Sequence, residues 1–203
     1  MPKFSPLALA VLAMLTEAPM HVYRIQQLIK LRGKDDVINV RQRNSLYQTL
    51  DRLLRERLVV VHETERDGMF PERTVYAVTE AGRSTARGWL REQLAQPARE
   101  YPAFPVALSV LPLLSVDDAR RQLEARITAL EAELERLDAA RNAALALQIP
   151  RLFLLESELL QASVETELDW VRSVVAHLKA GALTWSEAWL KDVAERLAAS
   201  DPD

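Results

Sequence analysis

Six side chains that suit hydrogen bonding to nucleic acid lie close together in one short stretch of the chain. They are Arg41, Arg43, Asn44, Ser45, Tyr47 and Gln48. Arg can pair with guanine and Asn or Gln with adenine, whereas Ser and Tyr can hold phosphate oxygens. The group lies at or just inside an expected helix start, which also favours a phosphate. The pattern therefore predicts a helix that contacts DNA, and a solvated helix face is the alternative.

The residues from Asn44 to Gly82 indicate the elements that would position this group. Apolar residues follow a helical period at Leu46, Leu50, Leu53, Leu54 and Leu58. The opposite face carries Asn44, Tyr47, Gln48, Asp51, Arg52 and Arg55. A β-branched run at 58–61, a turn at 66–69 and a second strand at 74–78 follow. Thr79 is placed to cap the next helix, so the pattern predicts the second half of a winged helix-turn-helix.

Two arginines, Arg66 and Arg73, flank the tip of the expected hairpin. In a wing, such residues reach phosphates or a minor groove. The acidic residues Glu65, Asp67 and Glu72 dilute the positive charge, so a plain surface turn is the alternative. We count both arginines, and Arg52 on the outer face of the helix, among the candidate DNA contacts.

Composition and charge favour a globular protein of the cytoplasm. The chain has 203 residues, of which 49% are hydrophobic and 27% charged, and it has no cysteine. We expect neither a signal peptide nor a membrane helix from its apolar runs. The formal net charge is -3, but the charge is unevenly distributed along the sequence. Residues 1–90 contain 14 Lys and Arg and 10 Asp and Glu, whereas residues 91–203 contain 12 Lys and Arg and 19 Asp and Glu. A basic head on an acidic body suits a DNA-binding protein, although ordinary scatter would also give such a difference.

The pattern of titratable and nucleophilic residues does not favour an enzyme. His21, His62 and His177 are isolated from one another and lack the spacing of a metal or catalytic site. With only five glycines, no Gly-rich phosphate loop is evident. We expect no catalytic residues, no metal and no cofactor.

The whole chain is expected to be mainly α-helical, with a winged helix-turn-helix at residues 1–94 and a helical dimerisation domain at 115–203. Helices are expected at 7–15, 21–31, from 44, and at 79–94. Four prolines between residues 96 and 112 indicate a linker at 95–114, with at most a short helix near 106–111. Ser115 and Asp118 form a capping signature before a long helix, and further helices are expected at 152–178 and 185–199.

Two apolar stripes in the C-terminal half predict a homodimer. The first follows a strict heptad spacing, and the second is the apolar face of the next helix. Their members are Leu123, Ile127, Leu130, Leu134, Leu137, Leu160, Val164, Leu168, Val171 and Val175. The alternative, which is compatible with a dimer, is that the two stripes pack against each other in a helical hairpin of one chain.

Several short segments of the N-terminal half resemble the PadR family of transcriptional regulators. They are His21-Val22-Tyr23-Arg24-Ile25, Asn44-Ser45-Leu46-Tyr47, Arg73-Thr74-Val75-Tyr76 and Val78-Thr79-Glu80-Ala81-Gly82. The family pattern is roughly H-G-Y-E-I, then G-S-L-Y-P-A-L, then K-Y-Y-x-L-T-x-x-G at similar spacing. The match covers nearly all of residues 1–90, and the C-terminal half is similar in pattern to the longer members.

This resemblance implies a dimeric repressor, released by a small apolar or phenolic effector, that binds an inverted-repeat operator in double-stranded DNA. It adds Tyr23 to the candidate DNA contacts. Val22, Asn44 and Gln48 depart from the family pattern, and the last two stand at the DNA-facing helix start, so the operator sequence does not carry over from relatives.

Aromatic residues near the junction between the DNA-binding domain and the helical domain, in sequence or plausibly in space, are candidates for binding an effector. We select Trp89, Tyr101, Phe104 and Trp170, because flat apolar ligands favour aromatic walls. Core or interface packing is the alternative for these residues. For the chain as a whole, the competing hypothesis is a protein-interaction module whose winged helix binds a partner protein instead of DNA.

Overall fold

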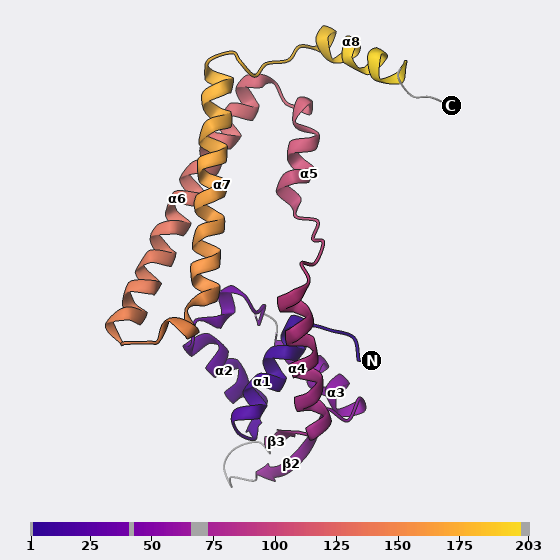
Figure 1. The fold of residues 1–203 in the computed structure, drawn as a ribbon, viewed down its shortest axis with the longest axis vertical. Coiled ribbons are helices and arrows are strands. Elements are labelled where there is room, and N and C mark those ends of the chain that lie inside the picture. The colour runs from indigo at the N-terminus through magenta and orange to yellow at the C-terminus, as the bar shows by residue number, and fades with distance from the viewer. Residues whose placement is uncertain (1, 41–42, 66–72, 200–203) are drawn as a thin grey trace. The chain divides into compact units, whose positions relative to one another are not determined.

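The computed structural model describes residues 2–40, 43–65 and 73–199, which form two compact units, Met1–Glu100 and Tyr101–Asp203 (Figure 1). It confirms the predicted fold class, because most elements are helices and a small sheet lies in the first unit. Among the described residues, no helix is both long enough and apolar enough to span a bilayer.

Four α-helices build the first unit: α1 (Pro6–Glu17), α2 (Val22–Leu31), α3 (Arg43–Arg55) and α4 (Glu80–Ala95), with the short 3-10 helix η1 (Lys34–Asp36) after α2. They agree closely with the predicted helices. Three begin with a side-chain cap: Ser5 accepts from Ala8, His21 from Arg24 and Thr79 from Gly82. The cap on α2 was not predicted, because His is not among the usual N-cap residues.

A three-stranded antiparallel sheet accompanies these helices, in the order β1-β3-β2. The strands β2 (Val59–Glu65) and β3 (Arg73–Val78) form the predicted hairpin, with an irregularity between Val61 and Glu63. The tip of the hairpin, including Arg66, lies outside the described residues. The two-residue strand β1 (Met20–His21) was not predicted: Met20 falls between the first two expected helices, and in the structure it pairs with Tyr76.

The junction of α3, β2 and α4 fixes where the wing leaves the helices. The helix α3 ends in a Schellman arrangement, in which Arg57 has a positive φ of 57° and the Leu58 amide donates to the Leu53 carbonyl at 2.9 Å. The Thr79 hydroxyl donates to the same turn, at 2.9 Å to the Arg57 carbonyl. A Cβ on Gly82 would lie 2.1 Å from the Leu58 carbonyl oxygen, so only glycine fits there. This contact explains the glycine of the T-x-x-G segment.

The second unit contains α5 (Ala103–Ser109), η2 (Leu111–Leu113), α6 (Val116–Ala146), η3 (Arg151–Phe153), α7 (Leu155–Lys179) and α8 (Glu187–Ala198). Ser115 caps α6 as predicted, by accepting a hydrogen bond from the Asp118 amide. The short helix in the Pro-rich segment begins at Ala103, earlier than expected, because prolines are well tolerated at a helix start. Residues 101–114 cluster with the helical unit, and α5 is the short helix that the sequence allowed in this segment.

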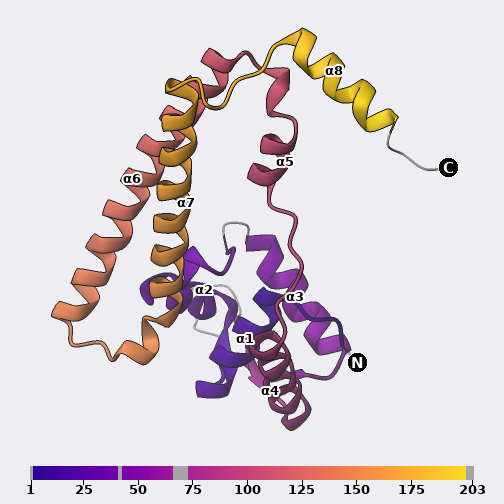
Figure 2. The same cartoon turned by 45° about the horizontal axis from the view of Figure 1, so that its top comes forward.

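The long helices α6 and α7 run antiparallel, side by side, as Figures 1 and 2 both show. The two predicted apolar stripes meet each other here, which is the hairpin alternative that the sequence left open. Leu123, Val171, Val175 and Leu178 form the buried centre, and Ile127 and Leu130 pack on it. Of the remaining members, Leu137 and Leu168 are buried, whereas Leu134, Leu160 and Val164 are half-buried. Most of these side chains therefore already pack against other residues of the same chain.

Candidate nucleic-acid interface and an apolar groove

The helix α3 separates its apolar and polar residues onto two faces. Leu46, Leu50 and Leu53 are fully buried in the core of the first unit. Residues on the opposite face are exposed, including Asn44, Gln48 and Tyr47, whose side chain is 52% exposed. An exposed tyrosine, one turn after Asn44 and next to Gln48, gives this face a set of hydrogen-bonding groups and an aromatic ring.

The start of α2 brings a second tyrosine to the same region. Tyr23 is 59% exposed and stacks at 6.2 Å from the His21 ring. A small cleft between α2 and α3 is lined by Val22, Tyr23, Gln26, Leu46 and Tyr47. The Gln26 amide donates to the Val40 carbonyl at 3.2 Å, which ties α2 to the segment before α3. The structure thus brings Tyr23 and Tyr47, two of the predicted DNA contacts, to one cleft.

The remaining predicted contacts differ in what the structure shows of them. Ser45 is half-buried, and its carbonyl accepts a hydrogen bond from the Thr49 hydroxyl at 2.7 Å. Arg52 is half-buried, and its Nε is buried without a hydrogen-bond partner among the described residues. Arg41 and Arg66 lie outside the described residues. Arg43 begins α3 and Arg73 begins β3, but only their backbone is described.

Tyr76 of β3 borders this region from the core side. Burial raises the pKa of the Tyr76 phenol, and the negative charge of Asp51 adds to this effect. The phenol therefore stays neutral at physiological pH. Its ring packs in the hydrophobic core of the first unit.

The four predicted effector residues do not form one site: Trp89 belongs to the first unit and the other three to the second. Trp89 is buried in the core of the first unit, with its ring 5.8 Å from Phe4 in an edge-to-face contact. Trp89 thus serves packing, the alternative given for it. Phe104 and Trp170 form another edge-to-face pair in the second unit, at 6.3 Å. Tyr101, just before α5, is 77% exposed.

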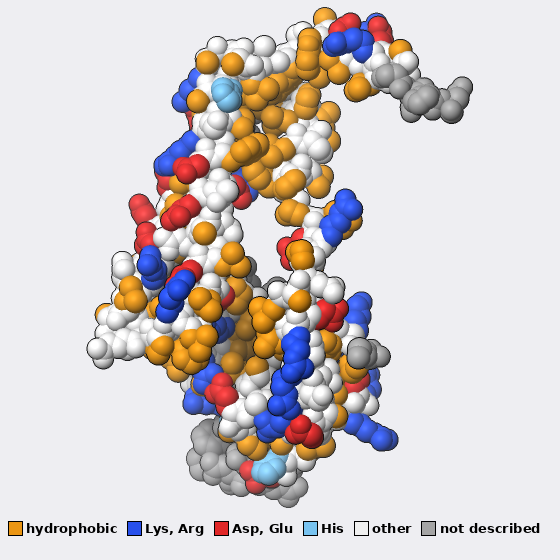
Figure 3. Space-filling model, in the orientation of Figure 1, with side chains coloured by type: hydrophobic (Ala, Val, Ile, Leu, Met, Phe, Trp, Pro, Cys, Tyr) orange, Lys and Arg blue, Asp and Glu red, His pale blue; other side chains and the backbone are white. Residues whose placement is uncertain are grey.

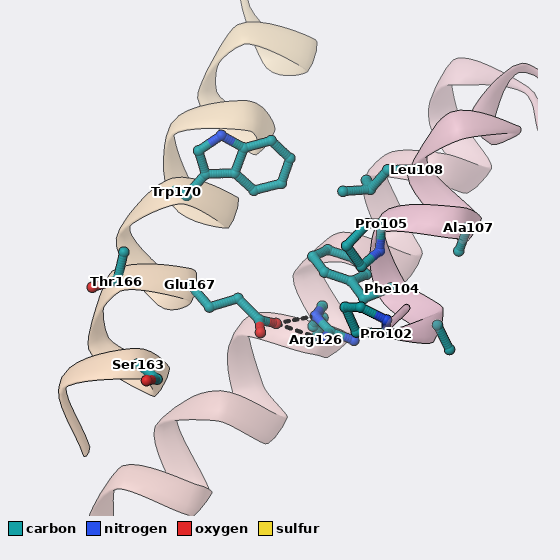
Figure 4. Close-up of a pocket in the computed structure, with 11 residues that line it drawn as sticks. Pro102, Phe104, Pro105, Ala107, Leu108, Arg126, Ser163, Thr166, Glu167 and Trp170 are labelled. Carbon is teal, nitrogen blue, oxygen red and sulfur yellow. Dashed lines mark hydrogen bonds and ion pairs between the residues drawn. The ribbon is translucent and has the colours of Figure 1, made fainter. Parts of the chain in front are cut away.

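An open groove of about 850 Å³ lies between α5 and α7, with part of α6 as its floor (Figure 4). One wall carries Pro102, Ala103, Phe104, Pro105, Ala107 and Leu108, and the other Ser163, Thr166, Glu167 and Trp170. On the floor, the Arg126 guanidinium lies 3.5 Å from the centre of the Phe104 ring and forms an ion pair with Glu167. Figure 3 shows hydrophobic side chains gathered over α5 and the edge of α7 that faces it.

Sequence reasoning found the two aromatic residues of this groove but not its other members. Arg126 and Glu167 meet across two helices, 41 positions apart in the sequence, and no short motif signals such a contact. Ser163, Thr166 and Trp170 do share a helical spacing of three and four residues, which was available in the sequence.

Residues 11–88, which contain α2, α3, the hairpin and most of α4, match the transcriptional regulator PadR-like family. The N-terminal domain belongs to the PadR-like family. No curated protein matches the chain in sequence.

Solved structures of two regulators, one of them PadR, share the fold of nearly the whole chain. Bacillus subtilis PadR in complex with operator DNA has a TM-score of 0.70 at 18% identity, over 87% of this chain and 99% of that chain. The same protein in complex with p-coumaric acid gives 0.69 at 18% identity, over 85% and 98%. The Vibrio cholerae virulence activator AphA gives 0.65 at 20% identity, over 86% and 98%. The structural likeness therefore includes the helical unit, which the family match at residues 11–88 does not reach.

Proposed function

We propose that this chain is a sequence-specific DNA-binding regulator that places the start of α3 in a major groove. The observation that carries the proposal is the exposed polar face of α3, with Asn44, Tyr47 and Gln48, in a PadR-like domain. A B. subtilis protein of the same fold is known in complex with its operator. Asn44 and Gln48 suit adenine edges, whereas Tyr47 and Tyr23 suit phosphates.

The regulator acts as a homodimer on an inverted repeat. A two-fold dimer presents two α3 helices to successive major grooves, so half-sites are expected about 10 bp apart or at a multiple of this distance. Footprinting tests this arrangement: protection of two related half-sites supports it, and protection of one asymmetric half-site contradicts it.

The regulator is a repressor that a small apolar or phenolic molecule releases from DNA. Support comes from the family resemblance and from the B. subtilis relative in complex with p-coumaric acid, a phenolic acid. The groove beside Phe104 and Trp170 is the candidate site in this chain, because most of its lining is apolar and two aromatic rings form part of its walls. Its volume lies within the usual range for small-molecule sites.

Salt dependence of duplex binding tests the DNA-binding function. A regulator that neutralises several phosphates loses affinity steeply as salt rises. The competing module, which binds a partner protein, would show no duplex binding even at low salt. Effector binding is tested separately by tryptophan fluorescence with a panel of phenolic acids. Quenching that disappears in Trp170→Phe supports the groove, and a response that this variant retains in full contradicts it.

A further inference from the structure

Gln26 is a polar residue at the edge of the buried face of α2. Its neighbours Val22, Ile25 and Ile29 belong to the core of the first unit, whereas Gln26 is half-buried and lines the cleft between α2 and α3. Its Nε2 donates to the Val40 carbonyl at 3.2 Å, across 14 positions of the sequence. Gln26 thus joins α2 to the segment that leads into α3.

Val40 is a suitable anchor for the start of α3. Its side chain is 1% exposed and packs in the core of the first unit, and it precedes the first residue of α3, Arg43, by three positions. Packing holds the Val40 side chain, and the hydrogen bond from Gln26 holds the orientation of its peptide group. Because peptide units are rigid and planar, this orientation limits where the following helix can begin.

The hydrogen bond requires a donor at position 26. A backbone carbonyl only accepts, so the group opposite Val40 must donate, and the nitrogen is the end of the glutamine amide that does so. Methionine has nearly the length of glutamine but no N–H, whereas a lysine ammonium donates from a similar reach. The position therefore has a chemical requirement that substitution can test.

Two predicted DNA contacts stand on either side of this link. Tyr23 lies on α2 and Tyr47 on α3, both are more than half exposed, and both line the same cleft as Gln26. Their spacing depends on how α3 is placed against α2. Base edges are read by hydrogen bonds with narrow limits of distance and angle, whereas the attraction to phosphates is independent of sequence. A small displacement of α3 should therefore weaken sequence-specific binding more than non-specific binding.

We propose that Gln26 is a positioning residue for DNA recognition. Its amide holds the start of α3 at the place, relative to α2, from which Asn44, Tyr47 and Gln48 reach one duplex. This inference rests on the DNA-binding function proposed above, and it adds the residue that sets the geometry. Gln26 acts through α3 and not through a contact of its own with DNA.

Gln26→Met tests the proposal, and Gln27→Met is the matched control. Gln27 is the next residue of α2, it is exposed, and its Oε1 accepts from Arg24 at 2.8 Å. The quantity to measure is the ratio of the affinities for a selected operator and for a duplex of scrambled sequence, because partial unfolding lowers both affinities by the same factor. We expect the ratio to fall about fivefold in Gln26→Met, as for the loss of one hydrogen bond, and to stay unchanged in Gln27→Met. An unchanged ratio in Gln26→Met, or an equal fall in both variants, would overturn the proposal.

Gln26→Lys is the conservative variant that should restore the ratio, because lysine keeps a donor at this position. Its added charge raises the affinity for every duplex, so the ratio is compared and not the affinity itself. Gln27→Lys carries the same charge at the control position. A ratio as low in Gln26→Lys as in Gln26→Met would contradict the role of the donor.

Hydrogen exchange in the absence of DNA separates this inference from the proposed function. The amides of Tyr47 and Gln48 donate into the first turn of α3, so their exchange reports how firmly that turn is held. They should exchange about fivefold faster in Gln26→Met than in Gln27→Met, by the same loss of one hydrogen bond. If the unmodified chain prefers no duplex, the proposed function fails, while faster exchange in Gln26→Met still assigns the placement of α3 to Gln26. Unchanged exchange in Gln26→Met would overturn this placement even if the chain binds an operator.

Discussion

The two units of this chain differ in how completely they bury their apolar side chains. Of the buried apolar residues in the described part of the chain, 20 lie in the first unit and 7 in the second. For exposed large apolar residues the order is reversed, with 8 in the first unit and 16 in the second. The first unit therefore has the core of a domain that folds by itself. The second is a thin helical layer that is expected to gain the rest of its core from another copy.

The largest expected effect comes from making the same truncation in both units. Leu50→Ala removes a fully buried side chain from the first core and should cost about 2–5 kcal/mol of unfolding free energy. Leu159→Ala removes a 69% exposed side chain and should cost less than about 0.5 kcal/mol within one chain. Denaturant unfolding at low protein concentration measures both. Equal costs would mean that the second unit is already complete in a single chain.

Two glycines of α4 provide the next comparison, within the first unit. Gly82→Ala places a methyl group against the Leu58 carbonyl, and the resulting strain should cost about 3 kcal/mol or more. Gly88 has no atom within 4 Å of the position of a Cβ, so Gly88→Ala should instead stabilise the helix by up to about 1 kcal/mol. Thermal unfolding of the two variants should therefore shift in opposite directions. A shared direction would contradict the packing of α4 on the start of the hairpin.

Tyr47→Ala should weaken DNA binding without reducing the thermal stability of the first unit. The side chain is 52% exposed, so its loss should leave the melting temperature nearly unchanged. We expect duplex affinity to fall about tenfold, as for the loss of one good polar contact. Fluorescence anisotropy with a labelled operator measures the change, and Tyr101→Ala, an exposed tyrosine of the second unit, is the control. Unchanged affinity in Tyr47→Ala would place the recognition surface elsewhere.

The smallest expected effect concerns acid and the α6–α7 hairpin. The hydrogen bond from Lys179 lowers the pKa of the Glu124 carboxyl, and the charge of Arg120 contributes further. A lowered pKa stabilises the folded state above the ordinary value of 4.5, and this contribution disappears as pH falls below it. Glu124→Gln should therefore lower the melting temperature slightly at neutral pH, where the contribution is present, and match the unmodified chain well below pH 4.5, so its melting temperature falls less steeply with acid. If the melting temperature of Glu124→Gln depends on pH in the same way as that of the unmodified chain, Glu124 does not contribute to the acid sensitivity of the hairpin.

Local signals predicted most of the first unit. The leucines of α3, the β-branched run of β2 and the Thr79 cap all act over a few residues, so periodicity and capping rules located them. The strand β1 escaped prediction because two residues are too few for a strand pattern, and its pairing with Tyr76 is a long-range contact. The helix α5 was only partly found, since Pro102 and Pro105 suggested a linker and in fact lie at a helix start.

The candidate sites depended more strongly on tertiary contacts. The heptad of Leu123 and Ile127 showed that α6 packs on another helix, but periodicity does not say whether this helix belongs to the same chain. The structure supplies α7 of the same chain. The packing of this heptad within one chain is the hairpin alternative, which is compatible with a dimer, and its role as a dimer surface stays a prediction. Likewise, the aromatic residues pointed toward a ligand site, but only the structure separates Trp89 from the Phe104–Trp170 groove.

Selection of bound fragments from random DNA by the purified protein tests the central claim most directly. The claim predicts enrichment of one inverted repeat, with half-sites about 10 bp apart or at a multiple of this distance. The affinity for the selected duplex should fall steeply with rising salt. Absence of any enriched sequence at low salt would contradict a DNA-binding regulator, and enrichment of a single unrepeated half-site would contradict the dimer.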